Sequence, residues 1–341
     1  MDRRAVIARA PLLAAACLAG ACVAALSLGP ARVPPIDVVS ALLRALGFAV
    51  QVDERAYAIV VSLRLPRTLL AAIAGGTLAI AGATLQGLFR NPLADPGVLG
   101  ITGGATLGAV TAIYFGAAGL GGYALPLAGF AGGLCAALAV DRLARVEGRV
   151  PVAALLLSGI ALEALARALT GVLTYAADDR QLRDITLWLL GSYAGASWDR
   201  LAMILPFAGF AFAASAIFAR GLDALMLGER EAGHLGVPVE TVKRLAVAAS
   251  ALGVGAVVSV AGPVGFVGLV VPHLVRLTHG PGHRLLLPLA AFYGAALSVA
   301  ADTIARILVA PAELPVGLIT AAIGAPFFAV LIRRERRRLA A

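Results

Sequence analysis

Two pairs of ionisable residues interrupt the long apolar runs of this sequence. Glu163 precedes Arg167 by four residues, and Asp302 precedes Arg306 by the same interval. Residues at this spacing share one face of a helix, so each acid lies within reach of its base. Ionisable side chains inside a membrane helix are costly, which makes them candidates for function. Two roles stay open: an ion pair that holds helices together, which we favour, and a proton relay.

The segment 177–200 combines arginines and tryptophans between two apolar runs, and we interpret it as a periplasmic segment. Its aromatic residues fit the belt that forms where a membrane meets water. Arg180, Arg183 and Arg200 carry planar guanidinium groups, whose fork matches the geometry of a carboxylate. We therefore expect these arginines to contact carboxylates of a ligand or of a docking protein.

The sequence lacks the motifs of common enzymes and metal sites. A nucleotide-binding P-loop needs a lysine after a glycine-rich run, whereas the sole lysine, Lys243, follows PVETV. Cys17, Cys22 and Cys135 lie in apolar runs without a CxxC motif, and His273 has no second ligand at a metal-binding interval. We expect a chain that performs no catalysis and binds no metal or cofactor. If ATP drives its activity, a separate subunit binds the ATP and Mg²⁺.

Composition indicates the class of protein that positions these residues. The chain is 60% hydrophobic and 14% charged, with a mean hydropathy of +0.92, which excludes a soluble globular domain. About ten runs are long and apolar enough to cross a bilayer as helices. We predict an all-α polytopic membrane protein with a single transmembrane domain over 1–341. The predicted spans lie near 8–29, 57–89, 97–116, 121–140, 151–176, 201–220, 243–262, 264–278, 285–308 and 315–332, with a short surface helix at 36–46.

Positive charge gathers on one side of the predicted topology. When the spans alternate from a cytoplasmic N-terminus, most arginines fall on the cytoplasmic side, including the run RRERRR at 333–338. The positive-inside rule therefore places both the N- and C-termini in the cytoplasm. The net charge of +9 is explained by this topology, and we expect no nucleic-acid partner.

The stretch from Leu222 to Arg244 is the longest polar interruption between apolar runs in the second half of the chain. Gly228 and Gly236 divide it into two predicted short helices, along which apolar residues recur at helical spacing. An amphipathic hairpin of this kind suits either docking to a soluble partner or lying on the bilayer surface.

Small residues recur at every fourth position of several spans. Gly75 and Ala79 show this interval in the second span, and Gly104 and Gly108 show it in the third. Small residues at this spacing let membrane helices approach closely, where lipid gives no hydrophobic drive for association. We predict a compact helix bundle.

Five motifs, in order along the chain, resemble those of the FecCD-type permeases. These permeases are the membrane subunits of ATP-binding cassette (ABC) importers for iron–siderophores, haem and cobalamin. The motifs are RLPRTLLAAIAGGTLAIAGATLQGLFRNPLADPGVLGITGGA (64–105), LLLSGIAL (155–162), GEREAGHLGV (228–237), VGFVGLVVPHLVRL (264–277) and ELPVGLITAAIGAPFF (313–328).

The resemblance implies a type II ABC importer permease fold in the bacterial inner (plasma) membrane. Such permeases pair as homodimers, and the fifth span lines a pathway at the dimer axis. Their partners are two copies of a cytoplasmic ABC ATPase, a periplasmic substrate-binding protein and the lipid bilayer. The resemblance places the cytoplasmic coupling helices, which dock on the ATPases, at 222–240.

The resemblance also implies roles for particular residues. Contacts with the ATPase would come from Leu225, Met226, Glu229, Glu231, Ala232, His234, Leu235 and Gly236. The cytoplasmic gate and the pathway would use Asn91, Leu93, Val152, Ala153, Glu163 and Arg167. Contacts with the substrate or the binding protein would use Arg180, Arg183 and Arg200, with Arg55, Arg64 and Arg67 as further candidates.

The segment from Asp178 to Trp198 is most similar to haem-importing members, so we expect haem ahead of a ferric siderophore. Cobalamin comes last, because the gate position held here by Val152 and Ala153 is polar in the cobalamin permeases. An alternative from another class is an ion-driven secondary transporter, in which Glu163 and Asp302 would carry protons.

Overall fold

The computed structural model describes residues 3–117, 121–147 and 149–339, and its regular elements there are helices. A π-helix, η1 (Ala58–Arg64), and a 3₁₀-helix, η2 (Pro96–Leu99), accompany the α-helices. The α-helices are α1 (Arg3–Ser27), α2 (Pro35–Ala45), α3 (Glu54–Tyr57), α4 (Leu65–Leu88), α5 (Ile101–Tyr114), α6 (Ala124–Ala144), α7 (Val152–Tyr175), α8 (Asp179–Leu189), α9 (Trp198–Leu225), α10 (Glu229–His234), α11 (Val239–Ala261), α12 (Val267–His279), α13 (His283–Ile307) and α14 (Val316–Leu339). The predicted all-α class is confirmed.

Seven helical stretches of the described chain are long and apolar enough to cross a membrane, and two shorter apolar helices accompany them. The longest stretch is continuous from Glu54 to Leu88, because η1 joins α3 to α4 without a break. The helix that corresponds to the predicted span 57–89 therefore begins earlier than predicted, at Glu54. The predicted surface helix at 36–46 corresponds to α2.

The predicted periplasmic segment 177–200 contains a helix, α8, that was not anticipated. A capping box begins it, because Asp178 accepts from the N–H of Gln181 while the side chain of Gln181 accepts from the N–H of Asp178. Ile185 is its one buried residue, and Trp188 and Leu189 pack beside it. The acidic residue Asp178 followed three residues later by Gln181 was the signal in the sequence that could have found this helix.

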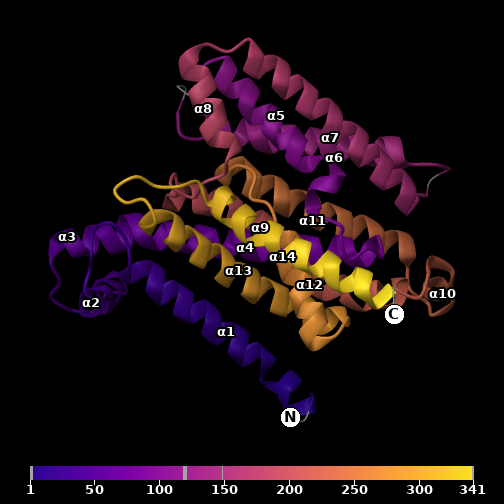
Figure 1. The fold of residues 1–341 in the computed structure, drawn as a ribbon, viewed down its shortest axis with the longest axis horizontal. Helices are drawn as coiled ribbons and strands as arrows, with labels where there is room; N and C mark the ends of the chain where they lie inside the picture. The colour runs from indigo at the N-terminus through magenta and orange to yellow at the C-terminus, as the bar shows by residue number, and fades with distance from the viewer. Residues whose placement is uncertain (1–2, 118–120, 148, 340–341) are drawn as a thin grey trace.

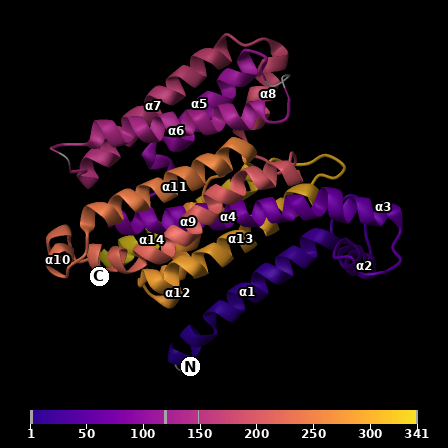
Figure 2. The ribbon, with the colours of Figure 1, turned by 180° about the vertical axis from the view of Figure 1, so that it is seen from behind.

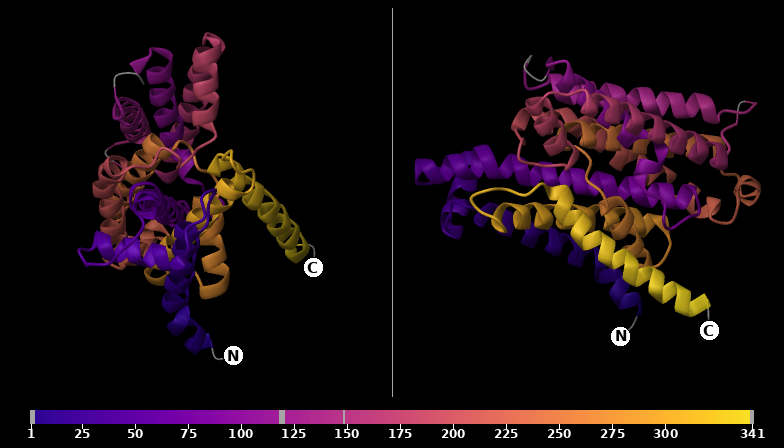
Figure 3. Two further views of the ribbon diagram at one scale, coloured as in Figure 1. Left: turned by 90° about the vertical axis from the view of Figure 1, so that its left-hand side faces the viewer. Right: turned by 45° about the horizontal axis from the view of Figure 1, so that its top comes forward.

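Figure 1 shows how the helices are layered: α5, α6, α7 and α8 form one layer, and α4 runs through the middle of the rest of the bundle. Figure 2 shows the same layers from behind. Helix α4 is buried along most of its length by α9, α11, α12 and α13. In Figure 3, α1 and α14 lie at the outside of the bundle.

Small residues bring the helices into close contact, as the spacing predicted. Gly75 of α4 packs against the backbone of Gly294 in α13, and Gly104 and Gly108 of α5 pack against Gly132 of α6. A side chain at these glycines would collide with the neighbouring backbone. The compact bundle thus depends on backbone-to-backbone packing.

The two ends of the bundle carry different elements. Helices α2, α3 and α8 lie at one end, whereas α10 lies at the other, together with the end of α14 and on the side where α1 begins (Figure 1). This arrangement fits the predicted topology, in which the chain ends and the coupling segment share one side of the membrane.

Candidate translocation pathway and coupling hairpin

A cavity of about 520 Å³ borders helix α7 midway along the bundle. Its wall combines residues of α7 with the connection before α5 and the turn after α11. The residues that line it include Asp95, Gly97, Val98, Ile160, Glu163, Ala164, Arg167, Val254, Val258 and Pro263. The only ionisable groups in this wall are two carboxylates and one guanidinium group.

Glu163 and Arg167 form the predicted ion pair. The Nε of Arg167 lies 2.9 Å from the Oε1 of Glu163. The other carboxylate oxygen of Glu163 accepts the N–H of Gly103 at 2.8 Å, so this side chain also caps the first turn of α5. The side chain of Arg167 is 78% exposed. An exposed guanidinium group midway along a membrane helix indicates a face turned to water or protein, not to lipid.

Asp95 stands beside this pair at the start of η2, where its Oδ1 accepts the N–H of Gly97 at 2.8 Å. Burial raises the pKa of Asp95, the N–H of Gly97 acts in the opposite direction, and the charge of Glu163 raises it further. The cavity wall therefore contains a buried acid, Asp95, beside the ion pair of Glu163 and Arg167.

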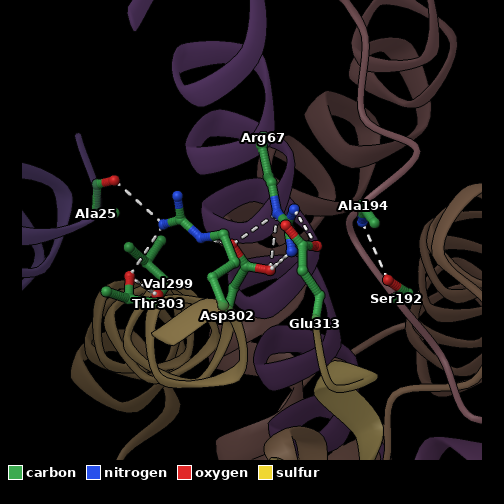
Figure 4. Close-up of polar contacts among 9 residues, drawn as sticks. Ala25, Arg67, Ser192, Ala194, Val299, Asp302, Thr303 and Glu313 are labelled. Atoms are coloured by element: carbon green, nitrogen blue, oxygen red, sulfur yellow. Dashed lines mark hydrogen bonds and ion pairs between the residues drawn. The ribbon is translucent and has the colours of Figure 1, made fainter. Parts of the chain in front are cut away.

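The second predicted pair belongs to a larger buried cluster (Figure 4). Arg306 lies 3.2 Å from Asp302, as predicted, and donates to the carbonyl of Ala25 at 3.1 Å. Arg67 also binds Asp302, with Nε and Nη2 at 2.8–3.0 Å from its oxygens, and reaches Glu313 at 2.7 Å. The cluster joins α1, α4, α13 and the loop before α14.

The buried arginines at this end of the bundle correct one expectation. Arg67 and Arg64 were candidate contacts for a binding protein, but both are buried, and Arg64 donates to the carbonyls of Leu26 and Ser27. For Asp302, the favoured role was an ion pair that holds helices together, and the alternative was a proton carrier in a secondary transporter. Two guanidinium groups hold both of its oxygens, so the geometry favours a structural ion cluster.

Sequence reasoning missed the partners Arg67 and Glu313. They lie 235 and 246 residues from their partners along the chain, far beyond the reach of helical periodicity. The one available clue was their position in the motifs RLPR and ELPVG.

The predicted gate residues lie at the end of the bundle that carries α10. Asn91 and Leu93 are exposed in the turn after α4, where Asn91 Oδ1 accepts the N–H of Leu93 at 2.9 Å. Val152 and Ala153 occupy the first turn of α7, with Ala153 exposed and Val152 half-buried. The turn at Asn91 is fixed by its own hydrogen bond, whereas Ala153 offers only a small apolar surface.

The predicted coupling segment forms one short helix, not two. Residues 222–225 continue α9, since Met226 still donates to Leu222, and the chain breaks at Gly228, which has a φ of 130°. Leu225 and Ala232 are buried and hold the hairpin to the bundle. The exposed predicted contacts are Met226, Glu229, Glu231, His234, Leu235 and Gly236.

The predicted periplasmic arginines separate into two groups. Arg180 and Arg183 are exposed on α8, three residues apart and so on one face. Arg200 lies half-buried in the first turn of α9, where its guanidinium group packs against Gly195. The pair on α8 is open to a ligand, and Arg55, a further candidate, is also exposed, on α3 at the same end of the bundle.

No group of three or more His, Cys, Asp and Glu residues that could hold a metal occurs within residues 3–117, 121–147 and 149–339. A polytopic helical bundle with an exposed hairpin at one end, and a largely apolar cavity that also contains Asp95, Glu163 and Arg167, is compatible with a membrane transport subunit. The comparisons with known proteins give the family. Residues 17–334 match the model of the FecCD transport family, so the chain belongs to that family.

Relatives of two named kinds are similar to the chain. It is 47% identical over 284 residues to the hemin transport system permease protein of Yersinia pestis, covering 81% of this chain and 84% of that one. It is 46% identical over 289 residues to the cobalamin import system permease protein of Halobacterium salinarum, covering 84% and 77%. A solved structure described as an inward-facing metal-chelate type ABC transporter superposes with a TM-score of 0.82 at 30% identity, covering 96% and 99%.

These findings confirm the resemblance drawn from the motifs. The chain is the permease component of an ABC transporter, and a multi-pass protein of the inner (plasma) membrane. Transport permeases of this family leave ATP hydrolysis to partner subunits.

Proposed function

We propose that this chain is the permease subunit of a binding-protein-dependent ABC importer that carries haem inward. A homodimer of the chain forms the pathway, two copies of a cytoplasmic ATPase hydrolyse ATP, and a periplasmic protein delivers the substrate. A ferric siderophore and cobalamin are the alternative cargoes of the same machinery. The chain itself supplies the pathway and its gates.

The pair Arg180 and Arg183 on α8 is the observation that carries the choice of haem. Both side chains are exposed, and α8 follows directly from the end of the pathway helix α7. Two guanidinium groups on one helix face suit a ligand with two carboxylates, such as the propionates of haem. Similarity to a hemin permease supports this choice, although cobalamin permeases are almost as similar.

The coupling hairpin links ATP binding in the ATPases to movement of the translocation pathway. When ATP binding closes the two ATPases, they move the coupling hairpins, and the dimer changes between outward-open and inward-open states. ATP can shift this equilibrium only if the ATPases bind the two states differently, which makes the hairpin contacts essential.

Uptake into proteoliposomes tests the function. The vesicles contain the permease, its ATPase and the binding protein, and are offered haem, a ferric siderophore or cobalamin with and without ATP. We expect ATP-dependent uptake of haem. ATP-dependent uptake of only cobalamin, or only the siderophore, would identify that compound as the substrate in place of haem. Uptake driven by a pH gradient without the ATPase would reject the ABC mechanism.

The double variant Arg180→Ala/Arg183→Ala tests the contact. Loss of charge-assisted hydrogen bonds of about 1.5–3 kcal/mol predicts haem uptake at least about tenfold slower at low haem concentration. The matched control is Arg32→Ala, which removes an exposed arginine from the loop before α2. Normal haem uptake by the double variant would reject these residues as ligand contacts.

A further inference from the structure

Lys243, the only lysine of the chain, is buried inside the cytoplasmic end of the bundle. Its side chain is 2% exposed, although it lies only five residues into α11. A buried ammonium group is costly unless each of its charges and N–H donors is satisfied. The partners of Lys243 therefore show why the fold keeps it there.

Three oxygens from three different segments surround the Nζ of Lys243. Glu229 of α10 lies at 3.1 Å, Glu240 of α11 lies at 2.6 Å, and the backbone carbonyl of Val150 lies at 3.0 Å. An ammonium group has three N–H donors, so this set satisfies it completely. The carboxylates of Glu229 and Glu240 already compensate the positive charge of Lys243. The hydrogen bond to the uncharged carbonyl of Val150 therefore satisfies an N–H donor and is not needed to balance the charge.

The bond to Val150 links the hairpin to the pathway helix. Val150 is buried, and it is followed by Pro151, the residue that caps the start of α7. Proline restricts the backbone dihedral φ, so the segment between Val150 and α7 has one fewer rotatable bond. A displacement of the Val150 carbonyl is therefore expected to shift the first turn of α7. That turn carries Val152 and Ala153, the predicted gate residues.

The other end of the link is open to a partner. The side chains of Glu229 and Glu240 are 43% and 35% exposed, and both border a hollow on the cytoplasmic face beside α10. A protein that docks on the hairpin thus meets the carboxylates that hold Lys243. A displacement of α10 relative to α11 would change the distance between Glu229 and Lys243, whose bond to Val150 comes from a different segment.

We propose that Lys243 is a positioning residue that couples the hairpin to α7: it binds Glu229 of the docking helix and Val150 at the start of the pathway helix, and so transmits ATPase movement to the cytoplasmic gate. The inference rests on the proposed function, since it assumes that an ATPase docks at the hairpin. It assigns to one side chain the connection between docking site and gate.

The test compares ATP hydrolysis with substrate uptake in proteoliposomes that contain the complete importer. Lys243→Met keeps the length and apolar stem of the side chain but removes the charge and all three donors. We expect ATPase binding and ATP hydrolysis within about twofold of the unchanged protein, and at least a tenfold fall in substrate molecules taken up per ATP. Lys243→Arg, which restores a charge and donors, should recover part of this ratio.

A second variant guards against a folding defect. Glu229→Gln removes one charge from a half-exposed position and leaves the bond from Lys243 to Val150 in place. It should lower uptake per ATP by several fold. Because Glu229 is also a predicted ATPase contact, the ratio is measured on purified, fully assembled complexes, so that a change in ATPase affinity does not enter it. The control is Arg145→Met, which removes an exposed ion pair with Asp141 at the same face and should leave the ratio unchanged.

Two outcomes would overturn the proposal. Uptake per ATP equal to that of the unchanged protein in both Lys243→Met and Glu229→Gln would show that the link carries no coupling. Loss of assembly in Lys243→Met together with normal uptake per ATP in Glu229→Gln would show that the lysine is only structural. Failure of the proposed function itself looks different, because the unchanged protein would then show no ATP-dependent uptake.

Discussion

At the scale of single residues, the charges inside this membrane protein serve two different purposes. In the cluster of four, Arg67, Asp302 and Arg306 are buried, Glu313 lies at its edge with a side chain 34% exposed, and each acid is held by at least one guanidinium group. By contrast, Glu163 and Arg167 stand in the wall of a cavity, with the guanidinium group exposed. Burial therefore distinguishes the charges that hold helices together from the pair that we propose faces the translocation pathway.

The closed cluster predicts a large loss of stability when its central acid is removed. Asp302→Ala leaves Arg67 and Arg306 buried with too few negative partners, and breaking a buried pair in this way costs about 3–5 kcal/mol. We expect a clear fall in the thermal unfolding midpoint of the detergent-purified protein. The midpoint should fall less in Asp302→Asn, because asparagine keeps an oxygen that can accept hydrogen bonds from the two arginines.

Asp141→Ala is the matched control, because it breaks an exposed ion pair with Arg145 at helical spacing. Such surface pairs contribute about 0–1 kcal/mol, so its unfolding midpoint should hardly change. Equal midpoints for Asp302→Ala and Asp141→Ala would contradict the view that the cluster holds α4, α13 and the loop before α14 together.

At the scale of elements, the hairpin between α9 and α11 is divided into an anchor and an exposed surface. Leu225 and Ala232 are buried against the bundle, whereas Met226, Leu227 and Leu235 expose large apolar side chains next to charged residues. Exposed apolar side chains among charges are typical of a docking surface. This arrangement favours a soluble partner over contact with the bilayer alone.

The double variant Glu231→Ala/His234→Ala tests this surface. Both side chains are exposed on α10 and neither belongs to the buried anchor. We expect ATPase affinity to fall by about tenfold in a pull-down from detergent, as when an interface loses one to two kcal/mol. Membrane insertion should be unchanged.

The control for the hairpin variant is Arg32→Ala/Glu54→Ala, which removes two exposed charged side chains at the opposite end of the bundle. This control should retain full ATPase binding. A pull-down by Glu231→Ala/His234→Ala equal to that of the control would place the docking surface elsewhere.

At the scale of the whole molecule, the bundle has two functionally different ends. Helix α8, with its two exposed arginines, lies at one end, and the hairpin with Lys243 lies at the other. The cavity beside α7 lies between them. The membrane therefore separates the surface that would meet substrate from the surface that would meet the ATPase.

Labelling of single cysteines tests this sidedness. In a variant lacking Cys17, Cys22 and Cys135, a cysteine is placed at the hairpin by Arg230→Cys or on α8 by Arg183→Cys. A membrane-impermeant maleimide should react with Arg183→Cys in cells whose outer membrane alone is permeable, and with Arg230→Cys only after lysis. Reaction of Arg230→Cys before lysis would put the hairpin outside and exclude ATPase docking there.

Most membrane-length helices and the ion pairs within them were predictable, because both depend on the order of apolar and charged residues over short stretches of the chain. Apolar runs of membrane length indicated the helices, and spacing by four residues indicated the pairs Glu163–Arg167 and Asp302–Arg306. Helix α8 was missed because it is short and largely polar and lies between two membrane-length runs, although the capping pair Asp178 and Gln181 marks its start. The motifs indicated the family, which the match over residues 17–334 confirms.

The sequence by itself determined the class of protein, most of the membrane-length helices and the ion pairs within them, because helical geometry fixes which neighbours along the chain can meet. Only the tertiary structure decided that Arg67 binds Asp302, that Glu163 caps α5, and that Lys243 reaches Val150. These partners come from different helices. Which helices meet, and at what height, is set by the packing of the whole bundle and has no period along the chain.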